Sequence, residues 1–337
     1  MNALNRRHFL LAAGAAAAGL MLRPADGWAE EGDDIVLGQG DFRYRVVPGW
    51  GVLDPEKHPV RDCHGMVEDK QGRIILLTNH TQNNVIVYDK AGNFLESWGN
   101  KYPGAHGLAI VEEDGKEFLF ITDHDLHKVF KTTLSGEEVM VLDFPEESGL
   151  YPLVDRYKPT DVAIAPNGDF FVCDGYGQFY VMKYDQPGKL IKTFGGPETM
   201  NTPHGACIDN RNPDAPCLLV AVRGKQELHR YDLDGGLLEV LPLPGADVCT
   251  AYVFGEEVYL PHLNGFVSIM DKANRVVSNL GADEPKYTDS GRLYKMEKNN
   301  DVFIHPHSIL VDSEGSIYVP QWNSNATYPI KLERVKA

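Results

Sequence analysis

The feature that most constrains this chain is an internal repeat, which returns roughly every 40–50 residues. In the first unit, turns at 70–72 and 90–92 interrupt four strand-like runs, at 64–69, 73–78, 85–88 and 94–98. β-Branched and aromatic residues favour pleated strands, whereas Gly, Asn and Asp favour turns, so each unit predicts four short strands. Later units begin at His106, Pro159, Pro203, Cys249 and Pro306. The repeat therefore predicts an all-β fold, a six-bladed β-propeller.

The last unit is one strand short, with strand-like runs only at 307–311, 316–319 and 330–332. Residues 42–47, which precede the first unit, are predicted to supply the missing outer strand, and this would close the ring without an open edge. After residue 29 no stretch keeps apolar residues three to four apart over several turns, which argues against a helical fold. Because the repeat runs through without a linker, we expect a single domain over residues 30–337.

Residues 1–29 are typical of a twin-arginine signal peptide. Arg6 and Arg7 precede an apolar run at 12–22, and small residues ending at Ala29 offer a cleavage site. The apolar run is too short to span a bilayer, although a membrane anchor is the alternative. We therefore expect export to the periplasm, with no membrane contact after the signal peptide is removed.

The net charge of the chain limits the kinds of binding partner that are expected. The chain has 32 basic and 48 acidic residues, a net charge of −16, which disfavours nucleic acid. A small-molecule or peptide substrate is the expected partner, and the oligomeric state stays open.

With five cysteines at least one is unpaired, and Cys207 and Cys217 are the nearest pair for a disulfide. No CxxC motif is present, so a thiolate zinc knuckle is not expected.

Histidines recur at one position of the repeat. In a propeller the first strand of each blade lines the central channel, so equivalent starts of these strands form a ring around the axis. In blade order those positions are held by His64, His106, Thr160, His204, Cys249 and His307.

Blades two, four and six lie about 120° apart, so their histidines are predicted to converge on one axial point. Three neutral imidazoles with an open position are typical of a catalytic zinc or a similar divalent ion. His64 would be a fourth ligand, or a donor to one of the others. The alternative is that each histidine packs in the channel and bonds a backbone carbonyl.

The loop after each second strand is predicted to open onto the same face as these histidines. A tyrosine beside a divalent metal can act as a general base, and an arginine can grip a carboxylate, so Tyr176 and Arg223 are the candidate catalytic residues. A packed turn aromatic and a surface salt bridge are the alternatives for these two. The candidate substrate-binding residues are Asn79, His80, His124 and His262.

Several motifs resemble the NHL-type propeller of peptidyl-α-hydroxyglycine α-amidating lyase, over roughly residues 60–335. They are Ala105-His-Gly-Leu-Ala109, Thr122–Lys131, Pro159-Thr-Asp-Val-Ala163, Asp174-Gly-Tyr176, Pro203-His204-Gly205 and Pro306-His307-Ser308. The resemblance implies zinc held by His106, His204 and His307. It also implies a catalytic role for Tyr176 and a pocket role for Arg223.

The chain departs from this family at three points. The essential first-blade arginine of the family falls near Asn79 or His80, and neither is arginine. The family cysteine after the catalytic tyrosine is Gly177, which removes a disulfide. His64 has no counterpart among the family's zinc ligands. Fold, metal and tyrosine are therefore expected to carry over better than the substrate, a C-terminal α-hydroxyglycine.

Three functions remain open at this stage. The first is a metal-dependent lyase that converts an α-hydroxyglycine peptide into an amide and glyoxylate. The second is a metal-dependent hydrolase of a lactone or ester, and the third is a non-enzymatic metal-binding or protein-binding propeller. The expected cofactor is zinc or another divalent transition metal such as copper, with a structural calcium as a further candidate.

Overall fold

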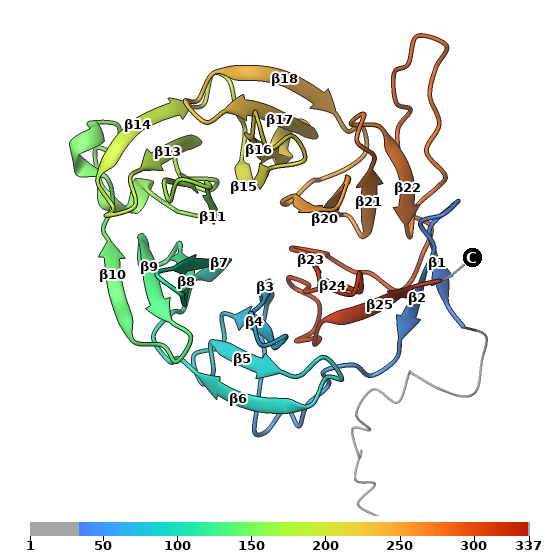
Figure 1. The fold of residues 1–337 in the computed structure, drawn as a ribbon, viewed down its shortest axis with the longest axis horizontal. Coiled ribbons are helices and arrows are strands. Elements are labelled where there is room, and N and C mark those ends of the chain that lie inside the picture. The colour runs from blue at the N-terminus through green and yellow to red at the C-terminus, as the bar shows by residue number, and fades with distance from the viewer. Residues whose placement is uncertain (1–33, 336–337) are drawn as a thin grey trace, which may run out of the picture. The chain divides into compact units, whose positions relative to one another are not determined.

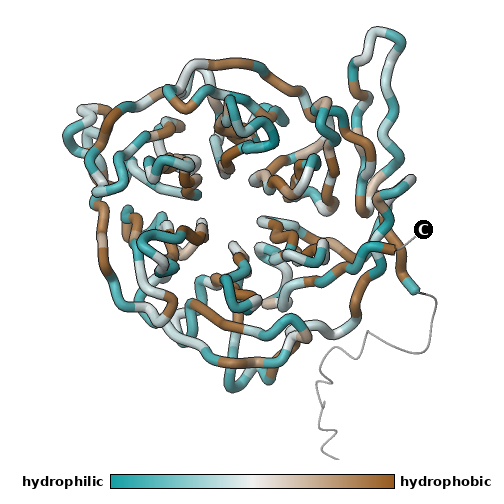
Figure 2. Tube along the Cα trace, viewed as in Figure 1, coloured by the Kyte–Doolittle hydropathy of each residue, from teal (hydrophilic) through white to brown (hydrophobic). Residues whose placement is uncertain are grey.

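A computed structural model describes residues 34–335, and these form six antiparallel sheets arranged in a ring (Figure 1). The predicted all-β, six-bladed propeller is thereby confirmed. The signal peptide predicted at residues 1–29 lies outside the described residues. Hydrophobic segments alternate with hydrophilic turns around the whole ring (Figure 2).

The first five blades each have four strands in chain order. Blade one contains β3 (Cys63–Glu68), β4 (Ile74–Thr78), β5 (Val85–Tyr88) and β6 (Phe94–Trp98). Blade two contains β7 (Ala105–Glu113), β8 (Lys116–Asp123), β9 (Lys128–Thr133) and β10 (Glu138–Leu142). Blade three contains β11 (Asp161–Ile164), β12 (Phe170–Cys173), β13 (Tyr180–Tyr184) and β14 (Leu190–Gly195). Blade four contains β15 (Pro203–Asp209), β16 (Cys217–Val222), β17 (Glu227–Asp232) and β18 (Leu237–Pro242). Blade five contains β19 (Tyr252–Phe254), β20 (Glu257–His262), β21 (Phe266–Met270) and β22 (Val276–Leu280).

The sixth blade joins the two ends of the described chain. Its inner strands are β23 (Leu310–Val311), β24 (Ile317–Val319) and β25 (Ile330–Arg334). The N-terminal strand β2 (Tyr44–Val47) pairs antiparallel with β25, which confirms the predicted closure of the ring. Strand β1 (Val36–Leu37) then adds a fifth strand that the sequence pattern did not predict. Closure pairs the outer edge of β25, which would otherwise be free to associate with another chain.

Two longer connections interrupt the regular repeat. The 3-10 helices η1 (Glu146–Ser148) and η2 (Val154–Arg156) lie between blades two and three, and η3 (Arg223–Lys225) follows β16. Between β22 and β23, the connection over residues 281–309 first leaves the ring, as the orange segment in Figure 1 shows, and then returns to the central channel, which His307 lines. In the part of the chain that the structure describes, no helix is long and apolar enough to cross a membrane.

Hydrophobic side chains fill the space between neighbouring blades. Strands β4, β12 and β16 are buried along their whole length, because each is an inner strand with a sheet packed on either face. Fully burying one such aliphatic side chain is worth about 1.5–3 kcal/mol. This packing holds the first strands around the axis, so that their N-terminal residues meet there.

All five cysteines lie among the described residues and are free thiols, so the disulfide considered for Cys207 and Cys217 is not formed. Cys207 stands opposite Leu219, and Cys217 stands opposite Asp209. The two cysteines are therefore diagonal neighbours, whose Cα atoms lie about 7–8 Å apart. That separation exceeds the reach of a disulfide.

Candidate metal centre

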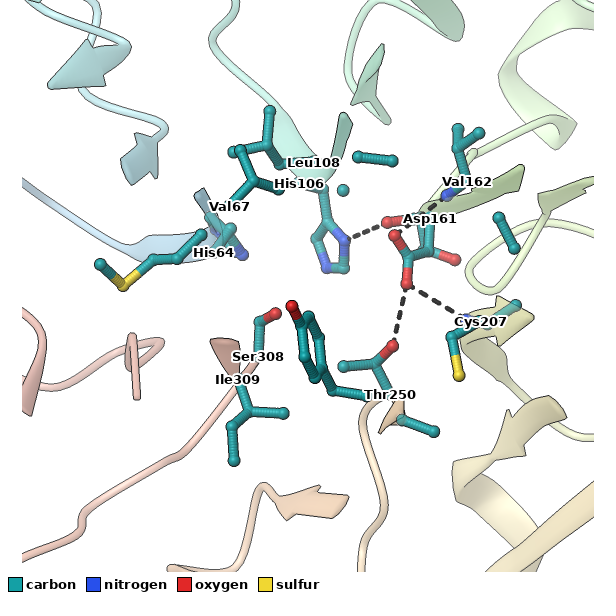
Figure 3. A pocket seen from close by; sticks show the side chains of 18 of the residues that line it. His64, Val67, His106, Leu108, Asp161, Val162, Cys207, Thr250, Ser308 and Ile309 are labelled. Carbon is teal, nitrogen blue, oxygen red and sulfur yellow. Dashed lines mark hydrogen bonds between the residues drawn. The ribbon is translucent and has the colours of Figure 1, made fainter. Parts of the chain in front are cut away.

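Four histidines meet at the axis of the ring. His64, His106 and His204 lie in β3, β7 and β15, and His307 lies in the segment before β23. All four are buried, with 2–3% of their surface exposed. They line a cavity of about 240 Å³ in the channel, and Figure 3 shows the side chains of His64 and His106 pointing into it.

A local irregularity turns three of these side chains toward the axis. The strand register shifts between Cys63 and Gly65, between Ala105 and Leu108, and between Pro203 and Gly205. Each shift is a β-bulge that takes a histidine out of the regular ladder. Bulges re-aim side chains next to functional sites, and here they direct imidazoles into the channel.

A glycine follows each of these three histidines because the neighbouring blade packs too closely to leave room for a side chain. A Cβ added at Gly107 would lie 2.6 Å from the carbonyl oxygen of Thr160, and one at Gly205 would lie 2.5 Å from that of Cys249. No larger residue fits where the neighbouring blade approaches so closely. The His-Gly pairs in the sequence therefore mark the contact between adjacent blades at the pore.

Imidazole separations define the shape of the cluster. Ring centroids lie 4.5 Å apart for His106 and His307. His64 lies 4.7 and 4.6 Å from these two, and His204 lies 4.8 and 4.7 Å from them. One ring nitrogen from each of His64, His106 and His307 lies within 4.8 Å of the others. His204, which the sequence predicts as a ligand with His106 and His307, is not in this set of mutually close nitrogens within the described residues. His106 and His307 thus form the middle of a four-histidine cluster, with His64 and His204 on either side.

Three of the imidazoles are oriented by backbone carbonyls of the following blade. Nδ1 of His106 lies 2.7 Å from the oxygen of Thr160, and Nδ1 of His204 lies 2.8 Å from that of Cys249. Nδ1 of His307 lies 3.3 Å from the oxygen of His64. A carbonyl only accepts, so each Nδ1 carries the proton and each Nε2 presents a lone pair. Metal-binding histidines are oriented by this type of bond.

The imidazoles are neutral at physiological pH. Burial is the largest cause, and it lowers the pKa of all four histidines well below 6.5. A neutral imidazole is the form that binds a metal. Within residues 34–335, Nε2 of His307 and both ring nitrogens of His64 have no hydrogen-bond partner. A buried polar atom left unpaired costs about 1–3 kcal/mol, so these nitrogens fit a site that takes a cation.

Tyr176 adds a phenol to the cluster. Its hydroxyl lies 2.9 Å from Nε2 of His204 and 3.2 Å from Nε2 of His106. The hydroxyl has one proton, so it can donate to only one of these two lone pairs. Nη2 of Arg223 donates to the same oxygen over 3.3 Å. Burial raises the pKa of the Tyr176 phenol, and the Arg223 charge partly offsets that rise.

The loop that carries Tyr176 is held by a buried carboxylate. Asp174 accepts hydrogen bonds from the Lys158 amide (2.7 Å), the Gln178 amide (2.6 Å) and the Tyr151 hydroxyl (2.8 Å). Burial raises the pKa of Asp174 to about 6 despite these bonds. A Cβ at Gly177 would lie 2.1 Å from the Asp174 carboxylate, so only glycine fits there. These hydrogen bonds hold the loop in one conformation, with the Tyr176 side chain directed to the histidine cluster.

The predicted substrate-binding residues do not all reach the cluster. The His124 ring lies 5.6 Å from that of His106 and 5.7 Å from that of Tyr176, which places it at the mouth of the site. Asn79 is buried and bonds Asp62. The half-buried His80 bonds only its own loop, where Nδ1 accepts from the Gln82 amide.

His262 lies inside the sheet of blade five rather than at the pore. It is fully buried, and its Nε2 lies 2.8 Å from the Ser268 hydroxyl. Its ring packs on Phe266. The loop after the second strand begins one residue later than the sequence pattern suggested, which leaves this side chain on the blade interior.

Comparisons with known proteins bear on this arrangement. Peptidyl-alpha-hydroxyglycine alpha-amidating lyase 1 of Drosophila melanogaster is 29% identical over 259 residues, which cover 69% of this chain and 45% of that protein. Peptidyl-glycine alpha-amidating monooxygenase A of Xenopus laevis is 34% identical over 270 residues, which cover 75% of this chain and 28% of that protein. The chain is a distant homologue of these amidating proteins. It spans less than half the length of either relative.

Comparison with solved structures bears on the fold alone. A gluconolactonase from Xanthomonas campestris superposes with a TM-score of 0.61 and 12% identity, over 92% of this chain and 98% of that chain. At that identity the likeness shows the propeller fold alone. No family model matches the chain.

Arg61 is an arginine of the first blade's entry loop that the sequence analysis did not single out. Its Nε donates to Oδ1 of Asn79 over 3.1 Å, so the guanidinium lies beside one of the two positions that correspond to the family arginine. The Arg61 side chain is 61% exposed. Burial, His106 and His124 lower the pKa of His64, and the Arg61 charge adds to that effect. Arg61 precedes β3 in a loop, where no repeat position points to it.

Asp161 was also missed, although it lies in one of the motifs. Its carboxyl lines the cavity and accepts hydrogen bonds from the amides of Val162 and Ala206 and from the Thr250 hydroxyl. Burial raises its pKa to about 7. Calcium prefers six to eight oxygen ligands, and this carboxyl is already engaged by three donors. The structural calcium stays a prediction.

Proposed function

We propose that the chain is an exported, metal-dependent lyase that cleaves α-hydroxyglycine peptides into an amide and glyoxylate. One observation carries the proposal: the Tyr176 hydroxyl lies between Nε2 of His106 and Nε2 of His204, and Arg223 donates to it. A base, a cationic anchor and a set of neutral imidazoles therefore converge within hydrogen-bond distance. The distant homology to amidating lyases supports the same assignment.

The imidazole set fits a borderline transition metal better than calcium. Imidazole suits zinc, copper, iron or nickel, whereas calcium takes oxygen ligands. His106, His204 and His307 would hold the ion through Nε2, because their Nδ1 atoms are bound to carbonyls. A divalent metal in this position would polarise a substrate oxygen and lower the pKa of the neighbouring phenol.

Tyr176 is assigned as the general base. As a phenolate it takes the proton of the substrate hydroxyl, and a carbon–oxygen double bond forms at that carbon. The C–N bond breaks, its electrons go to the amide nitrogen, and that nitrogen takes up one proton. The products are a peptide amide and glyoxylate, and no oxidant is consumed. Arg223 stabilises the phenolate through the hydrogen bond it already makes to the hydroxyl oxygen.

Two arginines are assigned to the substrate carboxylate. The guanidinium of Arg223 lies 5.5 Å from the Tyr176 ring centre, at the side of the pore. Arg61 lies beside Asn79 at the approach to β3. A guanidinium binds a carboxylate through two parallel hydrogen bonds, which orients the substrate as well as holding it. Export by the twin-arginine pathway to the periplasm is part of the same proposal, because that route accepts folded, metal-loaded proteins.

The test is a turnover assay on metal-loaded protein. Peptides that end in α-hydroxyglycine should release glyoxylate, and matched peptides that end in glycine should not. The assay is run with chelator-treated protein and with zinc-reconstituted protein side by side. Absence of glyoxylate with every reconstituted metal would rule out the proposed reaction.

The alternatives predict other results from the same protein. Hydrolysis of a lactone or ester, with no release of glyoxylate, would assign the site to a hydrolase. Metal binding with no turnover of any of these substrates would assign it to a binding propeller. Elemental analysis of the exported protein identifies the resident metal, and calcium without a transition metal would contradict the imidazole assignment.

A further inference from the structure

Alternate blades play different parts at the pore. Blades two, four and six contribute the imidazoles of His106, His204 and His307. Blades three, five and one contribute the carbonyl oxygens of Thr160, Cys249 and His64 that orient those imidazoles. Blades that donate an imidazole N–H therefore alternate with blades that accept it through a backbone carbonyl, and this pattern repeats three times around the ring.

The side chains of the acceptor blades show one exception to this pattern. Thr160 and Cys249 are small, and their side chains bond to backbone oxygens of Cys173 and of Pro306. His64 occupies the equivalent position in blade one with a full imidazole. Its carbonyl already fulfils the acceptor role, so the three-fold pattern gives the His64 side chain no function.

The His64 imidazole is buried without any polar partner. It is 3% exposed, and neither Nδ1 nor Nε2 makes a hydrogen bond within the described residues. No carbonyl orients the ring, unlike the other three imidazoles. It packs at 4.7 Å from His106 and 4.6 Å from His307, with its nitrogens directed into the same cavity (Figure 3). A packing role would be served equally by an apolar ring, so the two unsatisfied nitrogens point to a ligand.

We infer that His64 is a fourth imidazole ligand of the axial metal, together with His106, His204 and His307. The inference rests on the proposed metal centre and deepens it. Imidazole centroids on one tetrahedral ion lie about 5 Å apart, because the metal–nitrogen distance is about 2.0–2.1 Å. Five of the six imidazole pairs in this cluster lie 4.5–4.8 Å apart. The sixth pair, His64 and His204, makes no ring contact within the described residues, so these two imidazoles lie on opposite sides of His106 and His307.

A fourth imidazole changes what the site can bind and how it can work. Four neutral nitrogen ligands favour a borderline transition metal over magnesium or calcium more strongly than three do. With His64 bound, the four imidazoles would fill a tetrahedral shell, and a substrate oxygen would then be an additional ligand.

The experiment titrates chelator-treated protein with Co²⁺ and with Zn²⁺. The variants are His64→Gln, which keeps a polar side chain of similar length, and His64→Phe, which keeps an aromatic ring. The matched control is His229→Gln, since His229 is buried in β17, the third strand of blade four, and bonds Glu227 and Tyr231 away from the pore. Thermal unfolding of each metal-free variant checks that it folds.

We expect both His64 variants to lose affinity for Co²⁺ and Zn²⁺ on the order of 100-fold, since each ligand supplies a share of the binding free energy. The visible absorption of the saturated Co²⁺ complex should also change, because band intensity depends on coordination number. His229→Gln should match the wild-type chain in both measurements. Wild-type affinity and an unchanged Co²⁺ spectrum in the His64 variants would overturn the inference. Weaker binding with an unchanged spectrum would overturn it too, because His64 would then act indirectly.

The outcome is separable from that of the proposed function, because metal affinity is measured without turnover. A chain that binds Co²⁺ through His64 but releases no glyoxylate would keep the fourth ligand and lose the lyase assignment. Glyoxylate release together with unchanged metal binding in the His64 variants would keep the lyase assignment and exclude His64 as a ligand.

Discussion

Nδ1 of His307 donates a hydrogen bond to the backbone carbonyl of His64 across 3.3 Å, and this bond links the last blade to the first at the axis. The outer edge of the same junction is closed by the pairing of β2 with β25. The seam where the ring closes therefore passes through the metal centre. Binding of an ion to His64 and His307 would hold the inner side of that seam.

Metal should therefore raise the stability of the whole propeller. A ligand that binds only the folded state adds about 2.7 kcal/mol at a concentration of 100 times its Kd. We expect zinc to raise the melting temperature of chelator-treated protein, and His307→Gln to abolish most of that increase. Differential scanning calorimetry with and without zinc measures both effects. An equal increase in the variant would contradict the role of His307 as a ligand.

Tyr176→Phe should separate catalysis from metal binding. Removal of the hydroxyl deletes the general base, so kcat should fall by at least about 100-fold, the lower range of general base contributions. The ring and its packing stay, so zinc content should remain that of the wild-type chain. Glyoxylate release and elemental analysis on the same sample test both parts. Loss of zinc in the variant would instead make the phenol part of the metal site.

Arg223→Gln should weaken substrate binding through the carboxylate. A lost hydrogen bond to a charged group costs about 1.5–3 kcal/mol, equivalent to a fall in kcat/KM of about 10- to 150-fold. Arg61→Gln should raise KM in the same direction and to a smaller degree, because the Arg61 side chain is 61% exposed. Arg230→Gln is the control, since Arg230 pairs with Glu239 on the outside of blade four. Equal kinetics for all three variants would show that neither Arg223 nor Arg61 binds the substrate carboxylate.

Asp174→Ala should destabilise the fold as well as the loop. The change leaves the half-buried amides of Lys158 and Gln178 without their acceptor, at a cost of up to about 1–3 kcal/mol for each unpaired group. Asp185→Ala removes an exposed turn carboxylate that accepts from the Lys189 amide, and should cost less than about 1 kcal/mol. Urea unfolding of the two variants compares them directly. Similar losses in both would show that the Asp174 network adds little.

Acid should destabilise the metal-free chain below pH 6.5. The pKa of each cluster histidine is lowered by folding, so the unfolded chain binds more protons below 6.5 and the free energy of unfolding falls with pH. Each histidine contributes a slope of up to about 1.4 kcal/mol per pH unit. The pKa of Asp161 is raised to about 7, and its contribution runs in the opposite direction between pH 4 and 7.

Two variants isolate these contributions. His64→Gln should reduce the acid-side slope by up to about 1.4 kcal/mol per pH unit, and Asp161→Asn should make the slope steeper. Urea unfolding of chelator-treated protein at pH 5, 6, 7 and 8 supplies the comparison. A slope in His64→Gln equal to that of the wild-type chain would mean that the folded chain does not keep His64 neutral.

The repeat of strand-like runs and turns was sufficient to predict six blades, the closure by residues 42–47 and the ring positions of His64, His106, His204 and His307. These features follow from local patterns: strand and turn preferences are read residue by residue, and a closed repeat puts equivalent positions at equivalent places. Tyr176 and Arg223 followed from the same register, and the structure brings both to the histidines.

What only the tertiary structure decided depends on contacts between blades. The carbonyls that orient the imidazoles, the unpartnered nitrogens of His64 and the position of Arg61 beside Asn79 all join residues from different blades or loops. His262 shows the same limit, since a shift of one residue at a strand end moves a side chain from the pore face into the sheet. Sequence alone determines which residues can reach the axis. The packing of one blade on the next determines which ring nitrogen of each histidine faces the axis, because hydrogen bonds to carbonyls of the neighbouring blade orient the rings.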